Sequence, residues 1–357
     1  MTTVPPARAC VGTIPAYVPG RPPMPRPGLT SHKLSSNENP YPPLPGVLEA
    51  AAEATRRMNT YPDMGNAALY EALAQRLGLP VDRFAAGTGS VALIYHLLAA
   101  YCAPGDEVVH AWRSFEAYPI AITAADAVDV GVPVTADGRH DLPAMLAAVT
   151  ERTRVVMLCT PNNPTGPGLT HTEVREFVAA APPHVLVVLD EAYLEFVRMD
   201  DPLDGPALLG DHPNVVLLRT FSKAYGLAGL RVGYAVAHPE VAAAIRAVSL
   251  PFGVGVVAQA AAVASLEAHD ALMERVETLV AERDRVLAGV RQAGWEVPDP
   301  QGNFVWFPIA DPTEFVAAAE GLGLTVRPFV GDGVRVSIGE PEGNDRVIEL
   351  AQQVRPA

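Results

Sequence analysis

The amino-acid sequence predicts an α/β fold with a mainly parallel central sheet, helices on both faces, and a smaller α+β domain. Short runs rich in valine and leucine alternate with helical or turn-rich segments up to about residue 245. Such almost uninterrupted apolar runs are typical of parallel strands that are covered on both faces. Long helical segments and three further strand-like runs take over from about residue 254. A chain of 357 residues is long enough for two ordinary domains.

This pattern divides the chain into three parts. Residues 1–45 form a proline-rich N-terminal arm that we assign to the small domain, residues 46–245 form the large domain, and residues 246–357 form the C-terminal small domain. A proline-rich segment without periodicity is either a flexible tail or an extended arm that lies on another surface. The composition of the arm leaves both possibilities open.

Hydrophobic periodicity places the individual elements. Apolar residues at helical spacing predict helices over 47–58, 67–78, 91–101, 257–268 and 271–294. Strands are expected over the apolar runs 107–111, 127–134, 154–160, 184–192, 215–220, 230–237, 303–309, 324–329 and 334–339. Residues 83–87, Arg-Phe-Ala-Ala-Gly, make a poor strand candidate.

Composition excludes several classes of protein. The chain has 26 lysine and arginine residues against 40 aspartate and glutamate residues, and the net charge of −14 argues against binding to nucleic acid or to an anionic membrane. Its three cysteines are widely spaced, so we expect neither a disulfide framework nor a metal site. The N-terminus lacks a signal-peptide core, and proline and glycine break the uncharged run 247–266. We therefore expect a cytoplasmic protein without a membrane span.

The first candidate site segment precedes a helix. Active sites of open α/β sheets lie at the carboxyl ends of the strands, so residues that follow the apolar runs are the candidates. Residues 87–92, Gly-Thr-Gly-Ser-Val-Ala, could hold an anion on free backbone N–H groups, or could form a plain tight turn. The same G-x-G-x-x-A pattern recurs at 253–258 and no solid strand precedes 87–92, so a dinucleotide site is not favoured.

Three further segments directly follow apolar runs. Asn163 lies in Pro-Asn-Asn-Pro-Thr-Gly, Asp190 and Tyr193 lie in Asp-Glu-Ala-Tyr, and the third segment contains Lys223 and Arg231. Each has an ordinary alternative: a turn, a capping aspartate or a solvated lysine. Together they supply an amide, a carboxylate, a phenol, a lysine and an arginine. That set suits a cofactor with an aldehyde, a ring nitrogen and a phosphate.

These motifs carry a resemblance to a known family. The chain resembles the fold type I pyridoxal-phosphate enzymes, the aspartate-aminotransferase-like group, and within that group the histidinol-phosphate aminotransferase family. The resemblance rests on three motifs in this order: N-N-P-T-G, D-E-A-Y and S-K-A-Y-G-L-A-G-L-R-x-G-Y. The resemblance covers essentially the whole chain, from Y-V-P-G at 17–20 to G-V-R-V-S-I-G at 333–339. The segment W-R-S-F-E-A-Y-P at 112–119 looks like the actinobacterial phenylalanine (aromatic amino acid) aminotransferase branch. Histidinol-phosphate enzymes usually carry a tyrosine where Phe115 stands.

The resemblance implies pyridoxal 5′-phosphate as cofactor and assigns residues to it. Lys223 would form the Schiff base, Asp190 would pair with the pyridine nitrogen, and these two with Tyr193 would be the catalytic residues. The remaining cofactor contacts would come from Asn163 and Tyr193 at the ring 3′-oxygen, from Phe115 stacked on the ring, and, at the phosphate, from Ser90, Val91, Ser222, Arg231 and the partner subunit's Tyr61. Family members often carry an acidic or amide residue where Val91 stands, so only its backbone is expected to contribute.

The same resemblance implies the substrates. Arg335 would grip the substrate α-carboxylate, and Asn37, Tyr17 and Asn163 would line the substrate side. The implied reaction transfers the amino group of phenylalanine, tyrosine or tryptophan to the 2-oxo acid 2-oxoglutarate by a ping-pong mechanism. The implied assembly is a homodimer with shared active sites.

Two other functions remain as alternatives, and a third is set aside. Histidinol-phosphate transamination would need donors for the substrate phosphate, with Arg21, Arg26, Arg113 and Arg327 as candidates. Amino acid decarboxylation or C–S lysis uses the same fold, but Arg335 favours holding a carboxylate over expelling it. A non-enzymatic sensor domain of a transcription regulator would follow a helix-turn-helix domain, for which the proline-rich residues 1–45 are too few.

Overall fold

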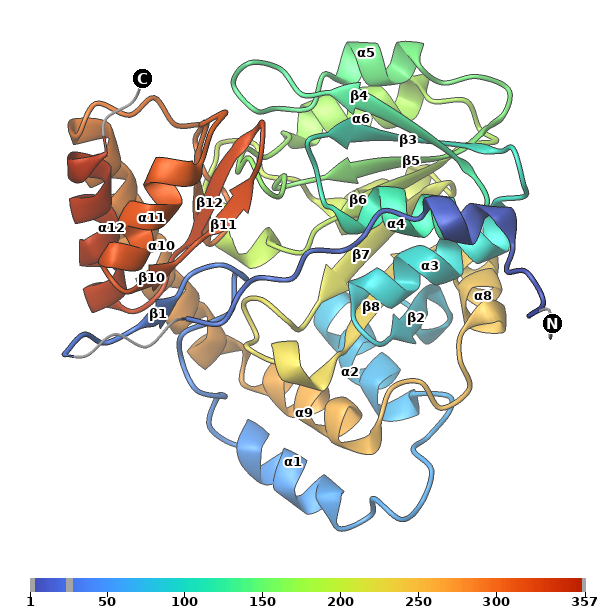
Figure 1. The fold of residues 1–357 in the computed structure, drawn as a ribbon. Coiled ribbons are helices and arrows are strands. Elements are labelled where there is room, and N and C mark those ends of the chain that lie inside the picture. Colours follow the sequence, from blue (N-terminus) through green and yellow to red (C-terminus); the bar gives the residue numbers. More distant parts are fainter. Residues whose placement is uncertain (1–3, 24–27, 355–357) are drawn as a thin grey trace.

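A computed structural model of the chain describes residues 4–23 and 28–354. Its largest sheet has seven strands in the order β2-β8-β7-β6-β5-β3-β4 (Figure 1). Neighbouring strands are parallel except around β8, which runs antiparallel to β2 and β7. The predicted mainly parallel sheet is therefore confirmed. Its strands are β2 (Phe84–Gly87), β3 (Glu107–Trp112), β4 (Val128–Pro133), β5 (Thr153–Cys159), β6 (Leu186–Asp190), β7 (Val215–Thr220) and β8 (Gly233–Ala237).

Strand β2 corrects one expectation. Its four residues make a poor strand candidate in the sequence, yet all four are buried and pair with β8 at the edge of the sheet. The backbone N–H of Ala86 also donates a 2.9 Å hydrogen bond to the Tyr70 hydroxyl. Tertiary contacts therefore stabilise a strand that local propensity does not favour.

Helices cover both faces of the seven-stranded sheet (Figure 1). Successive side chains of a strand point to opposite faces. In β5, Val155 and Met157 belong to the apolar cluster under α3, α4 and α8, whereas Val156 and Leu158 belong to the cluster under α6 and α7. The helices of this part are α1 (Val47–Thr55), α2 (Ala67–Leu77), α3 (Ser90–Tyr101), α4 (Ala117–Ala124), α5 (Leu142–Ala147), α6 (His171–Ala180), α7 (Gly205–Asp211) and α8 (Pro239–Val248), with 3-10 turns η2 (Val81–Arg83), η3 (Leu194–Phe196) and η4 (Ala228–Leu230).

The C-terminal elements build a second, smaller unit. Strands β9 (Phe304–Phe307), β11 (Arg327–Phe329) and β12 (Gly333–Ser337) form an antiparallel sheet in the order β11-β12-β9. The single strand expected over 324–329 is divided, because β10 (Leu324–Thr325) pairs instead with β1 (His32–Lys33). The helices of this part of the chain are α9 (Val256–Glu267), α10 (His269–Gln292), α11 (Thr313–Gly321) and α12 (Pro341–Gln353). Of these, α9 packs on α1 and α2, whereas α10 packs on α12.

The N-terminal arm lies on the rest of the molecule where the structure describes it. Its 3-10 turn η1 (Ala9–Thr13) contacts α4, and the chain then runs in an extended path toward the C-terminal unit (Figure 1). The β1–β10 pair joins the arm to that unit. Of the two interpretations of the arm, the extended one describes the structure. The domain boundaries at 45/46 and 245/246 stay a prediction, since α1 packs closely on α9 across the second of them.

The uncharged run 247–266 is a loop followed by the buried helix α9, as expected. Over the described residues, no helix combines the length and the apolar character needed to cross a membrane.

Candidate active site

A cavity of about 230 Å³ lies at the carboxyl ends of β3, β5, β6 and β7. The strands of an open α/β sheet bring the residues that follow them to this one edge. The structure thereby gathers at the cavity most of the side chains predicted from the sequence: Tyr17, Ser90, Val91, Phe115, Asn163, Asp190, Tyr193, Ser222, Lys223, Arg231 and Arg335. It also adds lining residues that the sequence did not single out, among them Ser36, Glu116 and Cys159.

Lys223 follows β7 and lies deep in this cavity. Its Nζ donates a 3.0 Å hydrogen bond to the backbone oxygen of Ser36. Burial lowers the pKa of Lys223 to about 7, and the positive charges of Arg335 and Arg231 act in the same direction. A lysine with a pKa near neutrality has a substantial fraction of uncharged amine, which is the nucleophilic and basic form.

Asp190 ends β6 and is fully enclosed. Its Oδ2 accepts a 2.8 Å hydrogen bond from the Tyr118 hydroxyl, while its buried Oδ1 has no hydrogen-bond partner among the residues the structure describes. Burial raises the pKa of Asp190 to about 6. A buried carboxylate oxygen without a partner is costly, so Oδ1 is suited to a cationic N–H group of a ligand.

Tyr193 and Asn37 form the next wall of the site. Asn37 does not line the cavity itself, but its Nδ2 donates a 2.9 Å hydrogen bond to the Tyr193 hydroxyl. The Ser337 hydroxyl in turn donates to Asn37 Oδ1 at 2.8 Å. Burial raises the pKa of Tyr193, so its phenol stays protonated and can donate to a ligand oxygen.

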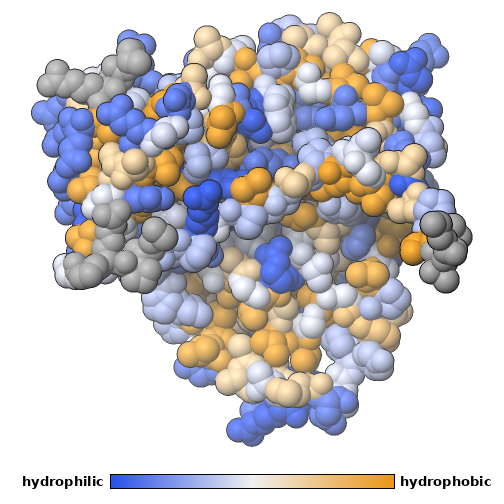
Figure 2. All heavy atoms as spheres, in the orientation of Figure 1, coloured by the Kyte–Doolittle hydropathy of each residue, from blue (hydrophilic) through white to orange (hydrophobic). Residues whose placement is uncertain are grey.

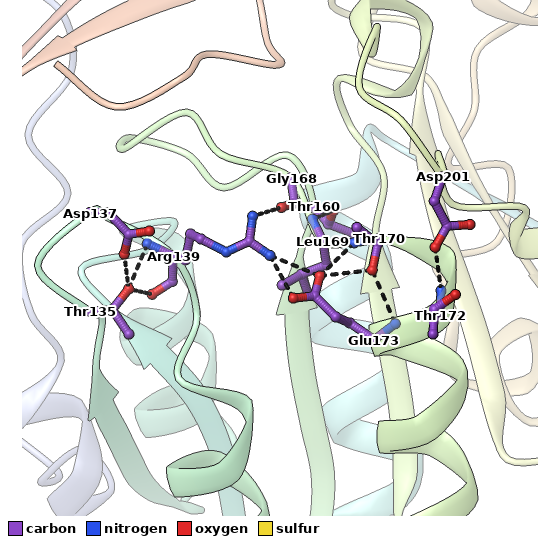
Figure 3. Close-up of polar contacts among 10 residues, drawn as sticks. All are labelled: Thr135, Asp137, Arg139, Thr160, Gly168, Leu169, Thr170, Thr172, Glu173 and Asp201. Atoms are coloured by element: carbon purple, nitrogen blue, oxygen red, sulfur yellow. Dashed lines mark hydrogen bonds and ion pairs between the residues drawn. The ribbon is translucent and has the colours of Figure 1, made fainter.

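Asn163 lies in the loop between β5 and α6, which a polar network holds in place (Figure 3). Arg139 donates to Glu173 Oε1 at 2.7 Å and Oε2 at 2.8 Å, and to the backbone oxygen of Gly168 at 3.0 Å. Thr170 and Glu173 form a capping box at the start of α6. The Leu169 N–H also donates a 2.8 Å hydrogen bond to the Thr160 hydroxyl, which joins the two ends of the loop. Asn163 Oδ1 accepts a hydrogen bond from Arg335 Nη1.

The start of α3 forms an anion cradle with Arg231. Gly89 is the N-cap residue of the helix with φ of 84°, and as a glycine it has no side chain to cap the free N–H groups of the first turn. A Cβ atom on Gly89 would lie 2.6 Å from Arg231 Nη2, so glycine leaves the space that the guanidinium uses. Arg231 Nη1 also donates to Ser222 Oγ at 3.3 Å. Free helix N–H groups, a hydroxyl and a guanidinium together fit a phosphate group.

Two aromatic site residues occupy different places. Phe115 lines the cavity and packs edge-on against Tyr118, with ring centroids 5.6 Å apart. Tyr61 lies outside the cavity, where its side chain is 81% exposed and stacks on Phe252 with ring centroids 4.6 Å apart. Within one chain, therefore, Tyr61 does not join the other site residues.

The arginines proposed as phosphate donors are separated by the fold. Arg327 lines the cavity and is paired with Glu116, whereas Arg113 is paired with Asp332 outside it. Arg21 lines a neighbouring groove. Arg26 lies outside the described residues.

Tyr118 is the main functional residue that sequence reasoning missed. It lies within the segment 112–119, but as a position of helix α4 it follows no strand directly. Its contact to Asp190 joins residues that are 72 positions apart in the chain. The only available signal was its presence in a segment already used for family resemblance.

The collected groups define the ligand that the cavity fits. An unpartnered buried carboxylate oxygen, an amine with a pKa near 7 and an open anion cradle match a ring nitrogen, an aldehyde and a phosphate. A pyridoxal-phosphate-like group carries all three.

Comparison with known proteins agrees with this chemistry. Residues 31–350 match the family model described as aminotransferase class I and II. The chain is 52% identical over 354 residues to an aromatic amino acid aminotransferase of Streptomyces avermitilis, covering 99% of this chain and 98% of that one. It is 51% identical over 346 residues to an aromatic amino acid aminotransferase of Thermobifida fusca, covering 97% of this chain and 96% of that one.

Solved structures show the same fold. The chain matches a histidinol-phosphate aminotransferase from Sinorhizobium meliloti in complex with pyridoxal-5′-phosphate with a TM-score of 0.83 and 30% identity, over 90% of each chain. A Thermus thermophilus aspartate aminotransferase variant matches with a TM-score of 0.81, over 90% of this chain and 96% of that chain. At 24% identity, that likeness concerns the fold alone.

Proposed function

Because the chain belongs to the class I and II aminotransferases, we propose that it transfers the amino group of an aromatic L-amino acid to 2-oxoglutarate with pyridoxal 5′-phosphate as cofactor. The observation that carries the proposal is the pairing, in one cavity, of a Lys223 amine with a pKa of about 7 and an Asp190 oxygen without a partner in the described chain. Relatives of about half identity over nearly their whole length support the aromatic substrate class, because their names carry it.

The chemistry follows from three groups. When bound, the cofactor supplies an aldehyde that takes up the amino group and a ring that withdraws electrons from the substrate carbon. Asp190 Oδ1 holds a proton on the ring nitrogen, since an opposite charge favours the ionised carboxylate over the protonated one. Lys223 would hold the cofactor covalently. Once displaced, its Nζ would take the proton from the substrate α-carbon as general base and, as general acid, deliver it to the cofactor carbon that carried the aldehyde.

The other residues bind and orient. Arg335 binds the α-carboxylate that the amino acid and the oxo acid share, through a bidentate contact. Asn163 and Tyr193 would hydrogen-bond the ring 3′-oxygen and Phe115 would pack against the ring. Ser222, Arg231 and the start of α3 would hold the phosphate. One cavity then serves the two substrates in turn, which predicts ping-pong kinetics.

A second copy of the chain is part of this proposal. Large apolar side chains are exposed near α1 and α9: Leu48, Met58, Tyr61, Met64, Leu250 and Phe252. Figure 2 shows hydrophobic residues over the lower part of the molecule, where these helices lie, above a hydrophilic tip. A homodimer would cover this surface and bring the partner subunit's Tyr61 toward the phosphate. Light scattering coupled to gel filtration tests the dimer, because a particle of one-chain mass contradicts it.

We further propose the cytoplasm as the location, since all three cysteines are free.

Histidinol phosphate is the competing substrate. The cationic side chains that it would need are already engaged, since Arg327 pairs with Glu116 and Arg113 pairs with Asp332. The deciding experiment mixes the holoenzyme, without an oxo acid, with L-phenylalanine or with L-histidinol phosphate and follows the cofactor absorbance. Rapid bleaching with L-phenylalanine alone is expected. Bleaching with histidinol phosphate alone would show that histidinol phosphate, and not an aromatic amino acid, is the substrate. Bleaching with neither compound would contradict transamination of both substrates.

A further inference from the structure

Two arginines lie directly opposite each other in the small antiparallel sheet. Arg327 of β11 and Arg335 of β12 are register partners, so their side chains project from the same face. Both line the cavity, and both are buried, with at most 7% of the residue exposed. Like charges at opposite positions repel each other, and the repulsion grows when water is excluded. The sheet therefore needs a compensating group for at least one of them.

The two guanidinium groups are compensated in different ways. Arg335 donates to neutral acceptors only, Asn163 Oδ1 and the backbone oxygen of Ser35 at 2.8 Å, and its buried Nε has no partner within the described chain. Arg327 Nη2 instead donates to the carboxylate of Glu116 at 2.5 Å. The arm supplies a second acceptor to Arg327, the backbone oxygen of Pro19 at 3.2 Å. Arg335 thus keeps an uncompensated charge for a ligand, whereas the charge of Arg327 is balanced.

The surroundings of Arg327 are aromatic. Its guanidinium carbon lies 5.3 Å from the centroid of Phe329, and Phe115 and Phe329 both line the cavity. An uncharged aromatic side chain would be well accommodated against these rings. It would be poorly accommodated against a bare guanidinium, which would lose its hydration without gaining a counter-charge.

We infer that Glu116 is the specificity-determining residue of this cavity. Its carboxylate neutralises the charge of Arg327, so that an uncharged substrate side chain can be bound. The same carboxylate limits how strongly Arg327 attracts an anionic substrate side chain. The inference rests on the proposed function, in which the cavity receives an aromatic amino acid and then a 2-oxo acid with a distal carboxylate. Arg327 remains able to attract that distal carboxylate, but against the repulsion of Glu116. Glu116 therefore sets the ratio of affinities for the two substrate classes.

The test measures binding of two unreactive carboxylates to the holoenzyme. Glutarate carries a distal negative charge, and 3-phenylpropanoate carries a neutral ring in its place. In Glu116→Gln the dissociation constant of glutarate is expected to fall about tenfold, because Arg327 gains a free charge. That of 3-phenylpropanoate is expected to rise about threefold, because the guanidinium beside its ring is left without a counter-charge. Asp332→Asn is the matched control, since it removes the acidic partner of Arg113 without touching the cavity.

Two results would overturn the inference. The first is that Glu116→Gln binds glutarate with the wild-type affinity, or changes that affinity no more than Asp332→Asn does. The same holds if glutarate binding is undetectable in both the wild type and Glu116→Gln. The second is that Arg327→Gln binds glutarate as tightly as the wild type does. This measurement tests the inference even if Glu116→Gln does not fold. Failure of the proposed function is a separate observation, because it appears as wild-type holoenzyme that is not bleached by L-phenylalanine.

Discussion

The Tyr118 hydroxyl donates a 2.8 Å hydrogen bond to Asp190 Oδ2, while the buried Asp190 Oδ1 has no partner among the described residues. One oxygen of the carboxylate is therefore fixed by helix α4 while the other is left for a ligand. A hydrogen bond to the ionised form also stabilises that form, and it partly opposes the effect of burial on the pKa of Asp190.

Tyr118→Phe is expected to lower kcat about tenfold with little change in KM, because Asp190 is held less well and its ionised form loses a hydrogen bond. A readout that does not depend on turnover is the pH titration of the bound cofactor's absorbance, whose midpoint is expected to move by about half a unit or more. Tyr101→Phe removes a hydroxyl on α3 away from the cavity and serves as control. Unchanged kcat and an unchanged midpoint would remove Tyr118 from this role.

Lys223→Ala is expected to abolish turnover and to leave the fold intact, since it deletes the amine that carries the proton but buries no new polar group. Turnover is measured with L-phenylalanine and 2-oxoglutarate, and folding by circular dichroism and thermal unfolding. Arg175→Ala, which removes an exposed cation on α6 that does not line the cavity, should keep its activity. Near-wild-type turnover of Lys223→Ala would contradict the mechanism.

Gly89→Ala is expected to weaken cofactor binding at least about tenfold, because its Cβ would collide with Arg231 Nη2 in the anion cradle. The affinity is measured by titrating the apoenzyme with pyridoxal phosphate. Gly105→Ala also places a Cβ at a positive φ, 89°, but away from the cavity, and is expected to leave the affinity for the cofactor unchanged. An unchanged affinity of Gly89→Ala would contradict the role of the cradle.

Arg139→Ala is expected to lower the free energy of unfolding by about 1–2 kcal/mol. Glu173 would lose the two hydrogen bonds from Arg139 Nη2, and the Gly168 carbonyl would lose the one from Nη1. Arg139→Lys should recover only part of this loss, since an ammonium group cannot reproduce the fork. Chemical denaturation measures both variants. Arg175→Ala, an exposed arginine on the same helix as Glu173, is expected to have little effect.

His140 predicts a loss of stability in acid. Burial lowers the pKa of His140 to about 4, from 6.5 in the unfolded chain, so the unfolded state binds more protons between these values. Stability is then full above pH 6.5 and falls as the pH drops toward 4, by about 2 kcal/mol from this residue at pH 5. His140→Gln stays uncharged, and denaturation at pH 7 and pH 5 should show a smaller difference than in the wild type. The exposed His184→Gln should not alter the difference.

The sequence was informative where chemistry follows a strand directly. Asn163, Asp190 and Lys223 each come soon after an apolar run, so the rule that such residues meet at one sheet edge was sufficient to group them. Apolar runs likewise predicted the parallel strands, because β3, β5, β6 and β7 are buried on both faces, whereas β4 at the edge of the sheet is mostly exposed.

The remaining features depend on contacts between distant segments. Glu116 and Arg327 are 211 positions apart, and neither belongs to a motif that names the other. The run 324–329 reads as one strand, yet its two halves pair with different partners, a distinction that its own residues do not encode. Tyr61 lies outside the cavity of its own chain, so its predicted role concerns a second chain and stays a prediction.

The pairing of β1 with β10 has a consequence for biosynthesis. Residues 32–33 pair with 324–325, and Asn37 and Ser337, which hydrogen-bond each other beside Tyr193, are 300 positions apart. A nascent chain emerges from the ribosome N-terminus first, so the arm must wait without its partner until almost the whole chain has been translated. The seven-stranded sheet, which ends at Ala237, has all its strands by then. Completing the substrate side is thus a late event in folding, and chains that stop before β12 would build the sheet without a working site.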